Sequence, residues 1–507
     1  MSPMCQKTSD LVAVRVESGA LLGRRTGTVT AFRGIPYAAP PVGPLRWRPP
    51  APALPWEGER PALEPGPAPV QPQPPRNSIM WHTNFADSRA LVMSEDCLYL
   101  NVWTPDPGGR GLPVLVFLQG GGNRFGHGGQ EIHDGGSMAR RGVVVVTLNS
   151  RIGALGFLPH PALAAEDDAG ASGNYGPLDV VAGLEWVRHN IAAFGGDPDR
   201  VTLGGNSAGA AIVNHLMAAD AARGLFRAAL GQSSAGMHRG EGPMPTQEQA
   251  QKEGLRALGP MASLPLEQLR RLPPVSFLLE AHLGMVVDGR LLTRDTQEVF
   301  HAGEQAAVPL LAGWNTDEGA IYTPPTAVAA LRERVTTGPF ATTLAPHFPV
   351  GEDDAVASAR QFTNETRFGG PVWRWARTHV ETVAAPCWVY RFDHAPPLPA
   401  DLDLAAPPDG GPGYGVFHTA ELPYTGDNLE CRRWPWTDVD HELARVTADA
   451  WARFVTDLDP NGAGLPTWPG FDATGDARTL VLGDPVRVER VHRVAALEAL
   501  DSLPRPL

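Results

Sequence analysis

Short runs of apolar residues recur along this chain, and their length predicts the strands of a sheet that is buried on both faces. The clearest runs cover residues 114–118, 143–148, 201–203, 228–230 and 308–313. Between the second and third runs, apolar residues recur at helical spacing over residues 179–194. Apolar strands separated by helices are typical of a parallel sheet. The pattern therefore predicts an α/β fold, with a central, mostly parallel twisted sheet flanked by helices.

The segments around this sheet have patterns of their own. Residues 11–30 alternate apolar with small or polar residues, which favours antiparallel strands at a sheet edge. Residues 49–75 are so rich in proline that we expect extended chain running over the surface. Further along, the pattern predicts helices over residues 210–222, 264–272, 443–455 and most of 324–385, a strand over 387–392 and a loop over 395–413. The proline-rich segment could be a linker between domains, but the motifs on both sides favour a single domain over residues 1–507.

Charge, hydropathy and cysteine usage indicate which partners and which cellular location to expect. The chain has 42 Lys and Arg against 55 Asp and Glu, a net charge of −13, and its arginine pairs are isolated, so we expect no nucleic-acid partner. No apolar run approaches the roughly 18 residues that span a bilayer, and the first ten residues are too polar for a secretory signal. The cysteines lie far apart without metal-ligand spacing, which favours reduced thiols: Cys5, Cys97, Cys387 and Cys431. We therefore expect a soluble, cytoplasmic protein.

A possible nucleophile follows the apolar run at 201–203. Residues 201–210 read Val-Thr-Leu-Gly-Gly-Asn-Ser-Ala-Gly-Ala, which places Ser207 in the pattern G-x-S-x-G. In this pattern a serine sits on a sharp strand-to-helix turn, and the backbone N–H of the next residue, Ala208, can point to the same place as the hydroxyl. A plain turn of small residues is the alternative, because the pattern also arises by chance.

A nucleophilic serine needs a base and an acid that orients the base, and in this type of fold both follow the serine in the chain. Six histidines lie beyond residue 340: His347, His379, His394, His418, His441 and His492. Only His418 follows a glycine-rich approach, residues 413–417, suited to a loop that rises from the sheet. Asp317 and Glu318 follow the strand predicted at 308–313, and spacing alone does not separate these two neighbours from one another or from helix capping.

Gly120, Gly121 and Gly122 follow the predicted strand at 114–118. Without a Cβ, their backbone can approach a substrate closely, and two backbone N–H groups there could stabilise a developing oxyanion. A flexible loop is the alternative.

Taken together, these residues resemble the type-B carboxylesterases, a family that includes para-nitrobenzyl esterases, animal carboxylesterases and cholinesterases. Similar segments span nearly the whole chain: residues 32–43, 94–102, 120–122, 149–158, 173–176, 194–209, 317–319 and 418–424. The resemblance implies an α/β-hydrolase fold, with insertions at about 238–290 and 320–385 that form pocket walls. It also implies a catalytic triad of Ser207, His418 and Glu318, with Glu318 chosen over Asp317 because the family uses the glutamate before the glycine. The oxyanion hole would be formed by Gly121, Gly122 and Ala208, with Ser233 behind the site.

The chain departs from the family pattern at three places. Asn206 replaces the usual glutamate before the serine, which argues against a choline-ester substrate and suggests that His418 lacks one stabilising carboxylate. Gln119 and Asn123 flank the glycines where relatives often have aromatic residues or histidine, and the GGGX loop that remains resembles enzymes with room for bulky or tertiary alcohols. Cys97 matches a cysteine that is disulfide-bonded in secreted relatives, but no partner lies between it and Cys5, so we expect no bridge.

The resemblance implies a serine carboxylic-ester hydrolase that acts through an acyl-enzyme on small, neutral esters, without a metal or organic cofactor and as a monomer or homodimer. A hydrolase of the same fold acting on carbamates, amides or a natural-product or xenobiotic ester is the alternative, and a non-catalytic binding module is a distant one. Further candidates for the pocket wall are aromatic: Trp81, Phe125 and Trp314. An aromatic at these positions is equally compatible with the core.

Overall fold

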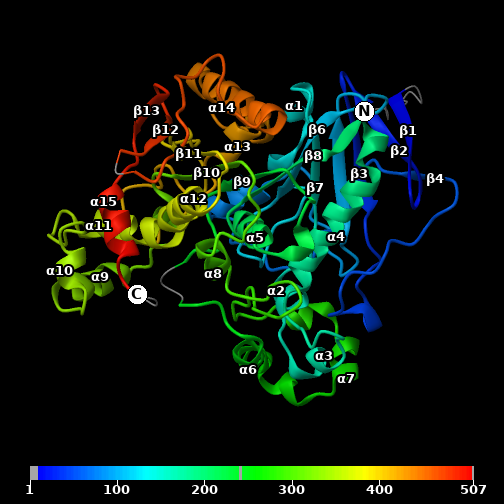
Figure 1. The fold of residues 1–507 in the computed structure, drawn as a ribbon, viewed down its shortest axis with the longest axis horizontal. Helices are drawn as coiled ribbons and strands as arrows, with labels where there is room; N and C mark the ends of the chain where they lie inside the picture. The colour runs from blue at the N-terminus through cyan, green and yellow to red at the C-terminus, as the bar shows by residue number, and fades with distance from the viewer. Residues whose placement is uncertain (1–9, 239–241, 475, 505–507) are drawn as a thin grey trace.

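Thirteen strands form one sheet within residues 10–238, 242–474 and 476–504, the part of the chain that the computed structural model describes (Figure 1). Their bounds are β1 Leu11–Val16, β2 Gly19–Thr26, β3 Val29–Pro36, β4 Glu59–Pro61, β5 Tyr99–Thr104, β6 Leu112–Leu118, β7 Val144–Leu148, β8 Gly196–Asn206, β9 Ala228–Gln232, β10 Leu310–Asn315, β11 Cys387–Phe392, β12 Arg478–Leu482 and β13 Arg487–Arg490. The strand order is β1-β2-β3-β5-β7-β6-β8-β9-β10-β11-β12-β13, with β4 beside β2.

The centre of the sheet is parallel and its ends are antiparallel. Strands from β7 to β12 pair in parallel, whereas β1, β2, β3, β5 and β7 pair antiparallel in succession, as do β12 and β13. This arrangement confirms the α/β-hydrolase fold with a mostly parallel sheet, and it confirms the antiparallel strands expected over residues 11–30. Parallel strands end at the same edge, so the loops after β6, β8, β10 and β11 can meet there.

Both faces of the sheet are buried, as the continuous apolar runs predict. Along β6, Val114 and Val116 belong to one hydrophobic core, and Leu115 belongs to a second core on the opposite face. The first core includes residues of α4, α5 and α12, and the second includes residues of α1, α13 and α14. Burying each such Val or Leu side chain contributes about 1.5–3 kcal/mol, so the alternation fixes the register of the strands.

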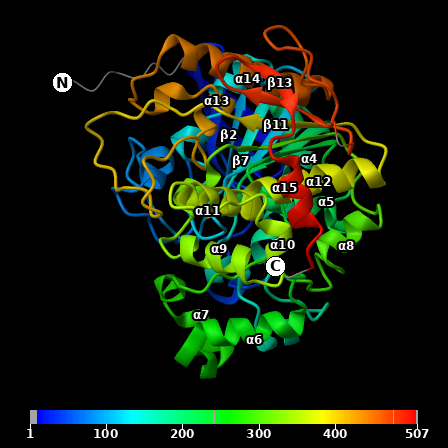
Figure 2. The same ribbon diagram turned by 90° about the vertical axis from the view of Figure 1, so that its left-hand side faces the viewer.

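The helices are α1 Gly136–Arg140, α2 Gly153–Phe157, α3 Pro161–Ala165, α4 Tyr175–Asn190, α5 Ala208–Met217, α6 Gln247–Leu258, α7 Leu266–Arg271, α8 Thr296–His301, α9 Ala327–Thr336, α10 Ala341–Leu344, α11 Ala355–Asn364, α12 Gly370–Thr382, α13 Leu422–Thr425, α14 Asp438–Asp457 and α15 Val494–Asp501. Both views place α14 at one end of the molecule and α6 and α7 at the other (Figures 1 and 2). Helices α9 to α11 lie together beside α15. No helix among the described residues is both long enough and apolar enough to cross a membrane.

Element boundaries differ from the sequence pattern in a few places. The strand predicted at 201–203 is longer in the structure, because β8 begins at Gly196, which pairs with Leu112 of β6, and pairing resumes at Val201 after a register shift. The proline-rich segment 49–75 contributes β4, which adds to the edge of the sheet. Cys97 and Cys387 are buried free thiols and Cys431 is a half-buried one, whereas Cys5 and the N-terminal residues 1–9 lie outside the described residues.

Candidate active site

Ser207 occupies the turn between β8 and α5, with φ 54° and ψ −123°. This conformation is costly for a residue with a side chain, and the neighbouring glycines make the turn possible. A Cβ on Gly209 would lie 2.3 Å from the carbonyl oxygen of Leu118, and a Cβ on Gly205 would lie 2.5 Å from the backbone of Gly209. Strand, turn and helix therefore pack so closely that the sequence G-x-S-x-G is a steric requirement here.

His418 and Glu318 lie in line with this serine. The Nε2 atom of His418 is 2.8 Å from Ser207 Oγ, and its Nδ1 atom forms a short hydrogen bond with Glu318 Oε2. Glu318 begins the 3₁₀ helix η9 (Glu318–Ile321) directly after β10, and its other oxygen accepts a hydrogen bond from the backbone N–H of Asn315 at 2.8 Å. All three side chains are buried or nearly so. In this arrangement the carboxylate fixes the Nδ1–H tautomer of the imidazole, which leaves Nε2 to accept the serine proton.

The two adjacent acidic residues have different partners. Asp317 Oδ2 accepts a hydrogen bond from the backbone N–H of Val416 at 2.9 Å, so this side chain holds the segment that leads to His418. Gly415 has φ 57°, and a Cβ there would lie 2.3 Å from the Asp317 carboxylate. The glycine-rich approach to the histidine is thus required for contact with Asp317, whereas Glu318 contacts the histidine itself.

Gly121, Gly122 and Ala208 present backbone N–H groups near the serine. Within the described residues, none of these three N–H groups donates a hydrogen bond to a backbone carbonyl or a side chain. Gly121 has φ 115° and Gly122 has φ 62°, and the Gly121 carbonyl accepts from the backbone N–H groups of Arg124 and Phe125 at 3.0 and 3.1 Å. The loop is therefore rigidly turned, with donors that can bind an anionic oxygen.

Behind the histidine lies a second buried carboxylate, Glu421. It accepts hydrogen bonds from Asn206 Nδ2 at 2.8 Å, from Asn315 Nδ2 at 2.6 Å and from the hydroxyl of Ser233 at 3.5 Å. Burial and the nearby Glu318 carboxylate raise the pKa of Glu421 to about 7, and the charge of His418 opposes this rise. Asn206 is thus a donor to a buried acid.

Glu421 bears on the replacement of the usual glutamate by Asn206 before the serine. The sequence suggested that His418 lacks the carboxylate that a glutamate at position 206 would supply, and this stays a prediction; the structure adds that Glu421, from a different segment, lies within electrostatic reach of the imidazole. Sequence reasoning missed Glu421 altogether. Its signal was a lone acidic residue in the apolar segment 419–424, three positions after the histidine.

A cavity of about 500 Å³ opens above Ser207. Its walls come from the glycine loop, from α5, from residues within 234–238, 242–245 and 282–285, and from Tyr322 and Phe368. The rings of Tyr322 and Phe368 lie 5.4 and 4.6 Å from the imidazole of His418. Two arginines that the sequence did not single out, Arg124 and Arg367, also line the cavity.

The remaining candidate residues fall in different places. Asn123 and Phe125 line the cavity above Ser207, whereas Gln119 borders only a void of about 20 Å³ behind the loop. Trp81 lines a separate, neighbouring cavity. Trp314 is buried in β10 within the hydrophobic core, which is the alternative that the sequence left open for this residue. Ser233 and Asn206 are buried below the serine.

Comparison with known proteins gives consistent results across the chain. A family model described as "Carboxylesterase family" matches residues 10–337 and 349–497. The chain is 34% identical to the fumonisin B1 esterase of Sphingopyxis macrogoltabida, over 94% of this chain and 88% of that protein. It is 31% identical to the para-nitrobenzyl esterase of Bacillus subtilis, over 94% of this chain and 96% of that protein.

Solved structures resemble the chain over nearly its full length. A PNB esterase structure superimposes with a TM-score of 0.81 at 29% identity, covering 96% of this chain and 99% of that one. A carboxylesterase of Geobacillus stearothermophilus superimposes with a TM-score of 0.80 at 31% identity, with the same coverage.

Proposed function

The chain belongs to the carboxylesterase family and is a carboxylic-ester hydrolase, and we propose that it cleaves esters through an acyl-enzyme formed on Ser207. The contact of 2.8 Å between Ser207 Oγ and His418 Nε2, at the floor of an open cavity, is the observation that carries this proposal. A serine hydroxyl is a weak nucleophile until a base accepts its proton, and His418 is in hydrogen-bond reach to do so.

In the first half of the proposed reaction, Ser207 Oγ attacks the ester carbonyl while its proton passes to His418 Nε2. The imidazolium that forms is stabilised by Glu318, and the developing oxyanion is bound by the N–H groups of Gly121, Gly122 and Ala208. Each such donor typically contributes about 2.7–4 kcal/mol to the transition state. His418 then returns the proton to the leaving alcohol, and water repeats the sequence on the acyl-enzyme to release the acid.

A series of 4-nitrophenyl esters of increasing acyl length tests this proposal on the wild type, Ser207→Ala and Ser234→Ala. We expect Ser207→Ala to lower kcat by at least about 10⁴-fold, because the nucleophile is lost. Ser234 lines the same cavity and, among the described residues, forms no hydrogen bond with His418, so Ser234→Ala is the matched control for removing a hydroxyl. Undiminished turnover by Ser207→Ala would refute the mechanism, and the chain-length profile of the wild type would size the cavity.

We also propose that the loop formed by residues 120–123 accepts bulky alcohols, including tertiary ones. Three glycines without side chains precede Asn123, which lines the cavity, and a Cβ on Gly122 would meet open space. Hydrolysis of tert-butyl acetate compared with n-butyl acetate tests this point. Good turnover of the primary ester with none of the tertiary ester would contradict it.

A further inference from the structure

The cavity above Ser207 has an unusual charge for this protein. Two arginines, Arg124 and Arg367, line it, together with His215, His238 and His282, and no Asp or Glu is among its described lining residues. The chain as a whole has more acidic than basic residues, 55 against 42. A wall whose described residues include no carboxylate is therefore contrary to the average surface, and it favours a negatively charged ligand.

Arg367 lies close to the proposed base. It belongs to the π-helix η10 (Glu365–Gly369), and its guanidinium carbon lies 4.7 Å from the ring centroid of Tyr322, which in turn contacts the imidazole of His418. The side chain is exposed to the cavity, and within the described residues it forms no ion pair and no hydrogen bond. Its contacts are with the faces of Tyr322 and Phe368. These aromatic faces hold the guanidinium plane and leave its N–H donors for a ligand.

Arg124 approaches the same cavity from a different segment. It follows the glycine loop by two residues, and its Nη2 atom donates to the carbonyl oxygen of Leu279 at 3.2 Å. Among the described residues no carboxylate pairs with it, so most of its donors also remain for a ligand. One arginine is thus tied to the oxyanion loop and the other to the aromatic residues around the base.

One of the histidines, His215, adds a polar group to the cavity and no charge near pH 7. His215 is buried, and its Nδ1 atom lies 2.7 Å from the hydroxyl of Thr296. Burial and the nearby His238 lower the pKa of His215 to about 4, so this imidazole is neutral near pH 7 and acts as a hydrogen-bonding group. The two arginines keep their positive charge at any pH near 7, because a guanidinium is not deprotonated in proteins.

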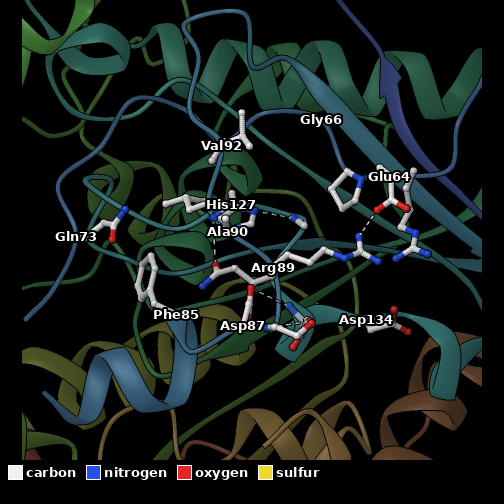
Figure 3. Close-up of a pocket in the computed structure, with 18 of the residues that line it drawn as sticks. Glu64, Gly66, Gln73, Phe85, Asp87, Arg89, Ala90, Val92, His127 and Asp134 are labelled. Atoms are coloured by element: carbon white, nitrogen blue, oxygen red, sulfur yellow. Dashed lines mark hydrogen bonds and ion pairs between the residues drawn. The ribbon is translucent and has the colours of Figure 1, made fainter. Parts of the chain in front are cut away.

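The neighbouring cavity of about 780 Å³ shows the opposite arrangement (Figure 3). Carboxylates line it beside its arginines, and one such pair forms the ion pair between Arg89 Nη1 and Glu64 Oε2 at 2.5 Å. Asp87 and Asp134 also line it. Among the described lining residues, the cavity that contains the serine thus has arginines without carboxylates, whereas its neighbour has both.

We propose that the preferred substrates are esters that carry a carboxylate on the acyl or the alcohol part, bound by Arg367 and Arg124 while Ser207 attacks the ester carbonyl. This proposal rests on the ester hydrolysis proposed above. Charge-assisted hydrogen bonds from a guanidinium to a carboxylate contribute about 1.5–3 kcal/mol, which corresponds to roughly tenfold or more in binding.

Two pairs of esters test whether the carboxylate is preferred on the acyl part or on the alcohol part of the substrate. For the acyl side, 4-nitrophenyl hydrogen glutarate is compared with its neutral isostere, 4-nitrophenyl methyl glutarate; for the alcohol side, 4-acetoxybenzoate is compared with methyl 4-acetoxybenzoate. After subtraction of the uncatalysed rate, we expect the charged member of one pair to have a kcat/KM roughly tenfold above its neutral partner. Because an exposed guanidinium is screened by salt, this ratio should fall between about 20 and about 500 mM salt.

Variants assign the preference to the arginines. We expect Arg367→Gln and Arg124→Gln each to lower the charged-to-neutral ratio by several-fold, and Arg367→Lys to retain part of it because the charge remains. Arg334, on α9, also lies over an aromatic ring, that of Phe362, but does not line the cavity, so Arg334→Gln is the control that should leave the ratio unchanged.

The outcomes separate this proposal from the one it rests on. Ratios at or below one for both pairs in the wild type, or ratios that the cavity variants leave unmoved, would overturn the preference for anionic esters. Turnover of the neutral esters that survives in Ser207→Ala would instead overturn the catalytic role of the serine and leave the charge measurements as evidence on binding alone.

Discussion

Replacing Glu421 by glutamine should remove a pH-dependent penalty on folding. The pKa of this carboxyl is raised from 4.5 to about 7, because it is buried and lies near Glu318. A folded-state pKa above the unfolded one means that the folded protein binds the proton more tightly. The resulting stabilisation is fully present below pH 4.5, decreases as the pH rises and is lost above about pH 7.

The size of the effect follows from the same two values. A difference of about 2.5 pKa units corresponds to about 3 kcal/mol of unfolding free energy. The glutamine side chain does not titrate, so the unfolding free energy of Glu421→Gln lacks this pH dependence. The wild type should therefore lose about 3 kcal/mol relative to the variant between pH 4 and pH 8. The Oδ1 atom of Asn206 has no partner among the described residues, so rotation of this amide can accommodate the new donor with an offset that does not depend on pH.

Urea unfolding of both proteins across this pH range measures the difference directly. A difference in unfolding free energy that stays constant within about 0.5 kcal/mol from pH 4 to pH 8 would refute the reasoning, whatever its absolute value. The rate profile gives a second readout in the same samples. Without the Glu421 charge the imidazolium of His418 is less favoured, so the acid limb of kcat/KM should move to lower pH and kcat should fall.

Three further substitutions probe other parts of the structure. Asn206→Glu should move the acid limb of kcat/KM to higher pH, opposite to the change in Glu421→Gln, because it adds a carboxylate near the base; a limb that stays in place would contradict this. Asp179→Asn should lower the unfolding free energy by about 3–5 kcal/mol, since it leaves the buried Arg151 guanidinium, now 2.6 Å from the carboxylate, without its counter-charge; urea unfolding that gives a loss below about 1 kcal/mol would refute it. Gly121→Ala should reduce kcat on 4-nitrophenyl acetate by at least about 10²-fold, because the new Cβ would lie 1.9 Å from the Phe125 carbonyl oxygen and displace the loop; an unchanged kcat would show that the loop is not the oxyanion site.

Local sequence patterns predicted much of the fold and indicated part of the candidate site. The parallel strands were recognisable because both faces of the sheet are covered, and β11 was predicted with its observed bounds, residues 387–392. Ser207 and His418 were recognisable because each needs a glycine-rich backbone, a requirement that is written into consecutive residues. Asp317 and Glu318 could not be separated by spacing, since the choice depends on which side chain faces the histidine after folding.

Features that depend on contacts between distant segments were missed in the sequence, or their position was left open. Glu421 is identified by donors that come from Asn206 and Asn315, more than a hundred positions away. Arg367 reaches the cavity only through the packing of η10 against Tyr322. The place of Trp314 was left open, because in a strand buried on both sides an aromatic residue faces either a core or a pocket, and the sequence does not distinguish the two.

The distances in sequence between the three residues of the proposed triad have a consequence for refolding. Ser207 and His418 are 211 positions apart, and Glu318 and His418 are 100 positions apart, yet they meet where β8, β10 and the segment beyond β11 come together. Contacts between such remote segments form slowly, because long loops must close before any of them is stabilised. Secondary structure can therefore return during refolding well before the hydrolysis of an ester does. The rate at which hydrolysis of a chromogenic ester returns in a refolding sample would therefore measure the last step, in which the central strands reach their final order.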